Sequence, residues 1–475
     1  MVCLDLQLGL HSCASRAADE PFVLPPNTDL PKFKAFLSCA ASVIDEANVQ
    51  VIDIYDDIAQ EEYMNPSKAH DMFHVLEKTH FVSSAVVAPR TVADVQEIMK
   101  LANEFEIPVW PFSKGRNVVY GGAAPRVPGS IGIDMGRHMN RVVKVDTENA
   151  YALVEPGVSY FELHEYLVKH NLRDKVWADV PDLGGGSVIG NTLERGVGYT
   201  PYGDHWMMHC GLEVQLFNYG FGSHNDGTFS QSSLGVVVKM GVWLMPNPGG
   251  YQAYMIIFPR DDDLDQIVEI LRPLRISFVI QNVPKLDNVL VSAALEGHRS
   301  DYTDSDKPLT EFELDEIAKK LGIGRWNLYG AIPPQRCSAT NPKQYVPGNP
   351  LHHRASMVRS PRRLSEEYGF DFIGAFLVGV REMHHIVCIL FDRKDPDSRR
   401  RAYELIKVLI AEAANRGWGE YRAHLALMDQ IAETYNFNSN AQMKLNEKLK
   451  NALDPKGILC PGKNGIWPAN YKKEE

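Results

Sequence analysis

The sequence lacks the features of a secreted, membrane-spanning or nucleic-acid-binding protein. Its seven cysteines are scattered singly along 475 residues, which is typical of a reducing compartment. The formal net charge is −11 and no stretch is strongly basic, which argues against nucleic acid as a partner. Lys239 and Arg381 interrupt the longest apolar runs before they reach the roughly 18 to 20 residues of a transmembrane helix.

The ends of the chain carry no sorting sequence that we identify. The opening "MVCLDLQLGLHSC" has Asp5 where a secretory signal would carry basic residues, and "YKKEE" is not a peroxisomal tripeptide. We therefore expect a cytoplasmic protein with no membrane partner.

The length and the hydrophobic periodicity predict an α+β protein of two domains, because 475 residues are too many for one core. Residues 84–90 and 107–112 read as strands on either side of a helix that Thr91 caps, a β-α-β arrangement. Three more strands follow, and Ser159 with Glu162 forms the capping box of a further helix. We predict a leader and first helix over 1–60, a first domain over 61–260, a second domain over 261–430, and a tail over 431–475 that returns to the first domain.

The second domain is predicted to combine helices with an antiparallel sheet. Residues 261–275 and 313–323 have helical spacing, and 369–392 reads as two strands joined without a long crossover. Between them, "PPQRCSATNPKQYVPGNPLHHRASMVRSPRR" (333–363) shows no periodicity, which is unusual for a compact domain.

Two glycine-rich stretches in the first domain indicate a ligand that contains a diphosphate. They are "PFSKGRNVVYGGAAPR" (111–126), directly after a strand, and "VPDLGGGSVIGNTLERGVGYTP" (180–201). Bare backbone with unused N–H groups is a common way to bind phosphate. The spacing does not fit the G-x-G-x-x-G pattern of a Rossmann site, since Ile189 stands where the last glycine is needed. A dinucleotide bound here needs a different fold.

Polar residues near these glycines are candidates for chemistry. A loop acid is most often a turn or cap residue, but Asp182, shielded beside a ligand, could exchange protons with a substrate. Tyr120 and the pair Tyr421–Arg422 could together hold a phenolate or a carboxylate. We predict no metal site, because His70 and His74, although four residues apart, lack an acidic third ligand.

Six segments together resemble the vanillyl-alcohol oxidase family, which includes eugenol oxidase and the 4-cresol dehydrogenase flavoprotein subunit. The resemblance runs from about residue 60 to about residue 470. These segments are "GRNVVYGGAAPR", "VPDLGGGSVIGNTLERGVGYTPYGDHWMMHCG", "FSQSSLGVVVKMGVWLMPNPGGY", "GRWNLYGA", "DFIGAFLVGVREMHHIVCILF" and "GWGEYRAHLALMDQIAETYN".

The resemblance implies a two-domain FAD-binding fold of the PCMH type, in which a cap domain covers the substrate site. It implies that Tyr120, Tyr421 and Arg422 bind the phenolate of a para-substituted phenol and that Asp182 serves as acid and base. A hydride would pass from the benzylic carbon to flavin N5, leaving a quinone methide, and oxygen would take the electrons to give hydrogen peroxide. The residues expected to bind FAD are Pro111, Ser113, Gly115, Arg116, Asn117, Asp182, Leu183, Gly184, Gly185, Gly186, Ser187, Gly190, Asn191, Glu194, Gly198, Tyr199, Gly235 and Val236.

The sequence also departs from the family pattern. Blocks are missing after Leu216 and after "GRWNLYGAI", so we expect a shortened cap. The second block carries the family's FAD-linked histidine; His352 and His353 lack that context, and Phe73 replaces the helper histidine, so we expect non-covalent FAD. The first block lies in a region that the family uses for assembly, which favours a homodimer over an octamer. The alternative is a degenerate flavin-binding protein, or a truncated gene product, without catalysis.

Overall fold

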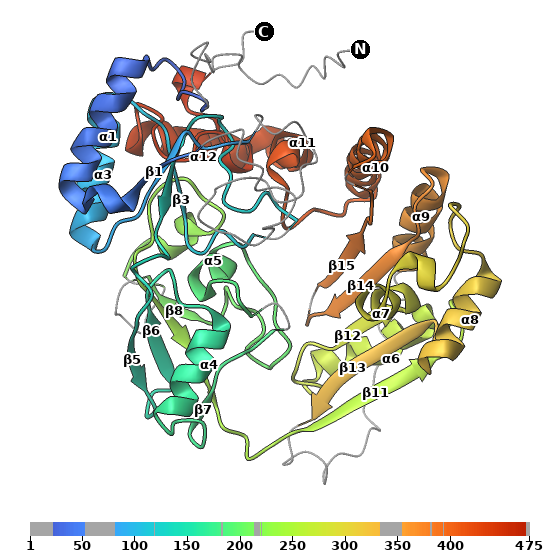
Figure 1. Ribbon diagram of the computed structural model, residues 1–475. Helices are drawn as coiled ribbons and strands as arrows, with labels where there is room; N and C mark the ends of the chain where they lie inside the picture. The colour runs from blue at the N-terminus through green and yellow to red at the C-terminus, as the bar shows by residue number, and fades with distance from the viewer. Residues whose placement is uncertain are drawn as a thin grey trace.

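The computed structural model describes residues 22–52, 81–117, 119–181, 184–212, 219, 221–332, 354–380, 382–392 and 394–471 (Figure 1). The chain forms two bodies. It crosses from the first to the second just before the strand β11 (Gln252–Phe258) and returns after the helix α10 (Pro396–Asn415), so that the C-terminal segment lies against the first body. This is the two-domain mixture of helices and sheets that the sequence predicts.

The first domain contains two four-stranded sheets. In the first sheet the order is β1-β2-β4-β3, and β4 is parallel to both of its neighbours. In the second sheet the order is β5-β6-β9-β8, and all pairs are antiparallel. The strands are β1 Val49–Val51, β2 Ala85–Val87, β3 Val109–Phe112, β4 Ile131–Asp134, β5 Val142–Asp146, β6 Tyr151–Val154, β8 His209–Gly211 and β9 Met240–Trp243.

Two helices of this domain begin where the sequence predicts. Thr91 caps α3 (Val92–Phe105) in a capping box with Asp94, and Ser159 caps α4 (Tyr160–Lys169) with Glu162. Apolar faces of α1 (Leu30–Ile44) and α3 pack on the first sheet, and α4 packs on the second. A two-stranded pair, β7 (Val176–Trp177) with β10 (Met245–Pro246), closes the second sheet's lower end, and α5 (Val188–Leu193) lies between the two sheets (Figure 1).

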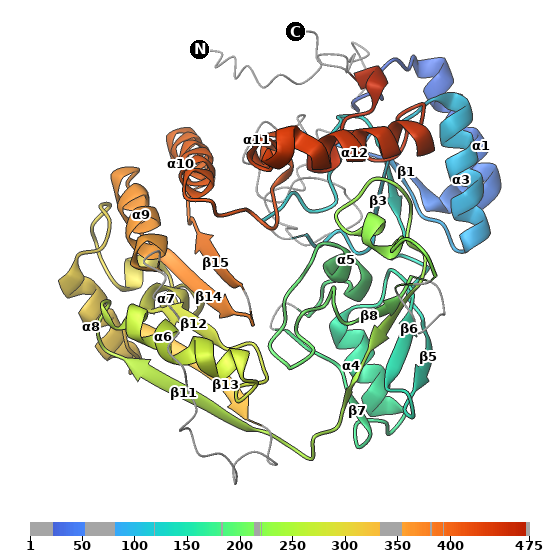
Figure 2. The same cartoon turned by 180° about the vertical axis from the view of Figure 1, so that it is seen from behind.

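The second domain is a five-stranded antiparallel sheet in the order β11-β13-β12-β14-β15, covered by helices. It begins at Gln252, ahead of residue 261, because β11 pairs along its whole length with β13. Edge strand β15 is the strand nearest the first domain (Figure 2). The elements are β11 Gln252–Phe258, α6 Asp263–Ile276, β12 Lys285–Asn288, α7 Val289–Glu296, α8 Glu311–Leu321, β13 Trp326–Ile332, α9 Arg354–Glu367, β14 Ile373–Val378, β15 Met383–Cys388 and α10 Pro396–Asn415.

The chain then returns to the first domain. Leu425 and Met428 already belong to the core around the first sheet, so the return precedes residue 431. Helices α11 (Met428–Thr434) and α12 (Phe437–Leu453) follow, and Leu459 makes a parallel bridge to Val109 of β3. The Lys450 ammonium, fully buried, binds the Ser233 and Leu459 carbonyls and the Asp454 carboxylate and so fixes this tail.

Candidate active site

The two glycine-rich stretches lie against each other. One follows β3, and the other leads into α5. A Cβ built on Gly185 would lie 2.7 Å from Nη1 of Arg116, and one on Gly190 would lie 2.7 Å from Oγ of Ser113. A side chain at either glycine would therefore displace the Arg116 or Ser113 side chain of the other stretch.

The backbone of both stretches fits the diphosphate of FAD. The N–H groups of Gly115 to Asn117 and of Gly184 to Gly186 donate to no acceptor among the described residues. Gly184 also has no room for a side chain, since its Cβ would lie 2.5 Å from the ring of Phe161. Backbone donors without a protein acceptor can bind the oxygens of a diphosphate.

The other residues expected at the cofactor have different surroundings. Pro111 lies within β3, and Ser187 caps α5, accepting a hydrogen bond from Gly190 N at 3.0 Å. The Tyr199 carbonyl accepts a hydrogen bond from Val283 of the second domain at 3.3 Å. Gly235 packs against Phe229, and Val236 packs against the core of the first sheet.

Asp182 and Leu183 lie outside the described residues, as do Phe73, His352 and His353. The roles expected for Asp182 and for the flavin attachment therefore stay predictions.

The structure brings Tyr120, Tyr421 and Arg422 together, although 300 residues of chain separate the first from the other two. The Arg422 guanidinium carbon lies 5.6 Å from the Tyr120 ring centroid. Burial, followed by the neighbouring Tyr421, with which Tyr120 also makes a hydrogen bond, raises the pKa of the Tyr120 phenol far above its usual range. Tyr120 therefore remains a hydrogen-bond donor at neutral pH.

The C-terminal end of α5 holds Arg422 in place. Its Nε donates to the Glu194 carbonyl at 2.7 Å, and its Nη2 donates to Oδ1 of Asn191 at 2.8 Å. Within the described part of the chain, Nη1 of Arg422 has no hydrogen-bond partner. Two edges of the guanidinium are therefore fixed to protein, and the third keeps two donors for a ligand.

Two charged groups of this site were not found from the sequence. Lys463 forms an ion pair of 2.7 Å with Glu194, and both side chains are less than a quarter exposed. Burial raises the pKa of the Glu194 carboxyl, but the charges of Lys463 and Arg422 outweigh it and the net pKa is lowered. Glu420 lies beside Tyr120, and burial raises the pKa of its carboxyl. In the sequence, only the position of Glu420 next to Tyr421 could have indicated that Glu420 belongs to this site.

The second domain reaches this cluster through β15. The His384 ring stacks on Tyr421 with centroids 4.8 Å apart, and burial lowers the His384 pKa. His385 points the other way and stacks on Phe376 at 4.2 Å, as expected for adjacent strand residues. The cap thus contributes a neutral imidazole to the site.

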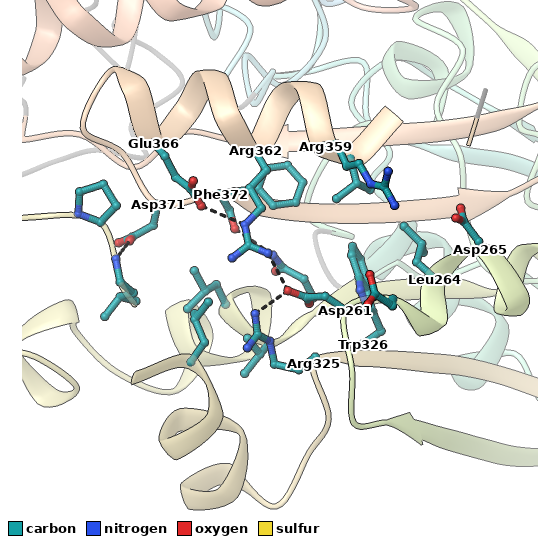
Figure 3. A pocket seen from close by; sticks show the side chains of 18 residues that line it. Asp261, Leu264, Asp265, Arg325, Trp326, Arg359, Arg362, Glu366, Asp371 and Phe372 are labelled. Carbon is teal, nitrogen blue, oxygen red and sulfur yellow. Dashed lines mark hydrogen bonds and ion pairs between the residues drawn. The ribbon is translucent and has the colours of Figure 1, made fainter. Parts of the chain in front are cut away.

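A pocket of about 140 Å³ lies elsewhere, among α6, α8 and α9 of the second domain (Figure 3). Arg325 and Arg362 project toward it, and both bind the Asp261 carboxylate, at 2.5 and 2.6 Å. Glu311 and Glu366 complete the network. Because these ion pairs connect the segments before and along α6, α8 and α9, the pocket joins helices and lies apart from the candidate active site.

The described residues contain no group of three or more His, Cys, Asp or Glu side chains that could hold a metal ion. None of the helices in the described segments is both long and apolar enough to cross a membrane.

Two family models match the chain, and they match it in different halves. Residues 83–220 match an FAD binding domain, and residues 348–464 match the C-terminal domain of FAD linked oxidases. The first match contains both glycine-rich stretches.

One curated relative covers most of both chains. The 4-cresol dehydrogenase [hydroxylating] flavoprotein subunit of Pseudomonas putida is 32% identical over 474 residues, which span 82% of this chain and 89% of the relative. The chain belongs to the 4-cresol dehydrogenase flavoprotein family. It is therefore an FAD-dependent oxidoreductase of that type, as the sequence motifs predict.

Two solved structures have the same fold as this flavoprotein. A 4-ethylphenol oxidase from Gulosibacter chungangensis, in complex with isoeugenol, matches with a TM-score of 0.83 and 33% identity over 94% of this chain and 100% of that one. A p-cresol methylhydroxylase with bound substrate matches with a TM-score of 0.82 and 28% identity over 94% and 99% of the two chains. Both support the PCMH-type architecture with its cap.

The flavoprotein is shorter than its relative in internal segments. The alignment with the Pseudomonas protein is 474 positions long, yet it takes up only 82% of the 475 residues of this chain. Many aligned positions therefore have a residue in the relative and none here, as expected if internal blocks are missing.

Proposed function

We propose that this flavoprotein oxidises para-substituted phenols. The observation that carries the proposal is the cluster of Tyr120, Tyr421 and Arg422, with two guanidinium donors left for a ligand oxygen. The 4-cresol dehydrogenase subunit is 32% identical to this chain and the 4-ethylphenol oxidase is 33% identical, and the names of both specify a para-substituted phenol.

In this proposal the chain activates the substrate by binding it as a phenolate. Arg422 supplies the positive charge, and Tyr120, kept protonated by its surroundings, donates a hydrogen bond to the same oxygen. The bound FAD would accept a hydride from the benzylic carbon of such a phenol, which turns the phenolate into a quinone methide. Asp182 then serves as the acid or base for the quinone methide or for the water that adds to it.

We propose oxygen as the electron acceptor, which gives hydrogen peroxide, because the 4-ethylphenol oxidase is so named. The protein is proposed to act in the cytoplasm as a homodimer. Gly115 to Asn117 and Gly184 to Gly186 hold the diphosphate, and we propose that FAD is bound without a covalent bond. Acid precipitation tests this last point, since flavin that stays in the protein pellet would contradict it.

The decisive experiment is anaerobic mixing of the purified yellow protein with vanillyl alcohol, 4-ethylphenol or eugenol. Loss of the visible flavin absorbance is expected, followed by its return and by peroxide when oxygen is admitted. The Asp182→Ala variant should keep its flavin and be reduced at least about 100-fold more slowly. Unchanged reduction would remove Asp182 from the mechanism.

The missing internal segments favour one alternative, a flavin-binding protein without catalysis. The same experiment separates the two functions, because such a protein would bind FAD and stay yellow with every phenol.

A further inference from the structure

A buried aspartate–histidine pair lies next to the proposed phenol site. Oδ2 of Asp179 is 2.7 Å from Nε2 of His205, and the two side chains are 6% and 5% exposed. Nδ1 of His205 lies 2.6 Å from Nδ2 of Asn191. Oδ1 of Asn191 in turn accepts a hydrogen bond from Nη2 of Arg422. These four side chains form one continuous line of hydrogen bonds that ends at the guanidinium.

The polarity of this line is determined at its Arg422 end. A guanidinium has only donors, so Asn191 must present its oxygen to Arg422 and its NH₂ group to His205. Nδ1 of His205 must therefore accept, which places the ring proton on Nε2, and Asp179 accepts that proton's hydrogen bond. Every donor meets an acceptor only while His205 is neutral and protonated on Nε2.

The surrounding backbone closes tightly on these side chains. A Cβ on Gly198 would collide with the Asp179 carboxylate, and one on Gly196 would collide with the Asn191 amide. The buried Tyr160 hydroxyl lies 3.0 Å from Nδ1 of His205 and 3.2 Å from Nδ2 of Asn191. The two glycines are therefore needed for this packing, and Asn191 has no space to turn its amide freely.

We propose that Asp179 and His205 are positioning residues that hold Arg422, through Asn191, in the orientation that binds the substrate phenolate. The inference rests on the proposed function, since it assigns these residues to the same site. Neither residue touches the substrate. Asp179 fixes the tautomer of His205, the tautomer fixes the amide of Asn191, and the amide fixes one edge of the guanidinium.

The test uses the FAD-loaded protein and 4-nitrophenol, a phenol with no benzylic hydrogen whose phenolate absorbs at a different wavelength from the neutral form. Wild type should bind it as the phenolate. His205→Leu and Asp179→Asn should each keep stoichiometric FAD, weaken 4-nitrophenol binding at least about 10-fold and lower its bound phenolate fraction. His205→Gln should recover most of the affinity, because its amide can donate to Asp179 and accept from Asn191.

Two controls make the result specific. The first control is His209→Leu. His209 is also a buried histidine beside an aspartate, with its Nε2 3.3 Å from Oδ2 of Asp226, but it makes no hydrogen bond to Asn191 or Arg422. Binding of 4-nitrophenol should therefore not change in this variant. In an Arg422→Met background, His205→Leu should cost no further affinity, because the pair acts only through the guanidinium.

The outcomes separate the two hypotheses. The positioning role is wrong if wild type binds 4-nitrophenol as phenolate and the Asp179 and His205 variants bind it equally well. It is also wrong if their loss of affinity adds to the loss caused by Arg422→Met. If wild type itself does not stabilise the phenolate, the proposed function fails instead. If His205→Leu loses FAD, Asp179→Asn is tested without it, and unchanged 4-nitrophenol affinity in that variant would also overturn the role.

Discussion

Arg422 and Tyr120 should contribute differently to phenol binding. Arg422→Met removes the only positive charge that directly faces Tyr120 in the described cluster, so the affinity for phenolate should fall about 100-fold. Tyr120→Phe removes one neutral donor and should cost about 10-fold. Binding of 4-nitrophenol measures both, and Arg363→Met, an exposed arginine on α9, is the control. Equal losses in the two variants would contradict the assignment of charge to Arg422.

Asp134 at the end of β4 should make stability depend on pH. Burial raises the pKa of its carboxyl to about 6, although Gly136 N and Arg137 N both donate to its Oδ1. The folded state therefore holds a proton that the unfolded state releases from about pH 4 upward, so stability falls between pH 4 and pH 6 and stays lower above it.

Asp134→Asn keeps an oxygen for both backbone donors and removes this cost of ionisation. We expect the variant to be more stable than wild type at pH 7.5, on the order of 2 kcal/mol, and to have no advantage near pH 4. Urea unfolding at the two pH values measures this. A stabilisation that is the same at both would show that ionisation of Asp134 is not its cause.

Val119 has a backbone conformation that its side chain disfavours. It is a β-branched residue at φ 63°, and it is 54% exposed, so little packing compensates the strain. Val119→Asn, which tolerates left-handed backbone, should stabilise the protein by about 0.5 to 1 kcal/mol. Val119→Thr keeps the branched shape and should change nothing, which thermal unfolding of the two variants can check.

Single site residues could be predicted where they lie within a recognisable sequence motif. They could not be predicted where their role depends on a side chain that is distant in the sequence. Tyr120, Tyr421 and Arg422 could be named together because the segments that contain them resemble the family. Lys463 and Glu194 are 269 positions apart, and no periodicity relates them. The Asp179–His205 pair was missed for the same reason, since a lone histidine in "YGDHW" carries no indication of a buried carboxylate.

At the scale of elements, local rules predicted the helices with capping boxes and the strands that alternate or are wholly apolar. The pairing of strands was not accessible, because β11 joins β13 across the whole of α6, β12, α7 and α8. That long-range pairing moves the start of the second domain to Gln252. The ion pairs among Asp261, Glu311, Arg325 and Arg362, which connect the cap helices, could not be predicted from the sequence either.

Arg325 should be important for the stability of the cap. Its side chain is 5% exposed and binds three carboxylates, that of Asp261 before α6 (Figure 3) and those of Glu311 and Asp315 on α8. Arg325→Met leaves these carboxylates facing one another and should destabilise the protein by about 2 kcal/mol. The control Arg363→Met breaks an exposed pair with Glu367 and should change stability by less than about 0.5 kcal/mol. Equal effects in urea unfolding would assign no special role to the network.

At the scale of the whole molecule, the two domains meet where β15 presents His384 to Tyr421, and the cap sheet ends on the other side at β11 (Figure 1). Family resemblance predicts a shortened cap, and this stays a prediction, because the alignment with the Pseudomonas relative assigns no gap to a particular domain. The sequence could not predict which edge strand of the cap sheet is left without a partner strand, because this depends on the order of the strands in the sheet.

We expect strand β11 to give the molecule a tendency to self-associate. Its residues Gln252–Phe258 carry no charge, and Met255, Ile256 and Ile257 are each 45 to 47% exposed. Within the described sheet β11 pairs only with β13, so its outer backbone groups can pair with a strand of another molecule. Met255→Lys places a charge on this edge, should cost at most about 1 kcal/mol, and should lower concentration-dependent association. Light scattering over a concentration series measures this, with Met255→Leu as the apolar control. Association that persists unchanged in Met255→Lys would place the contact on another surface.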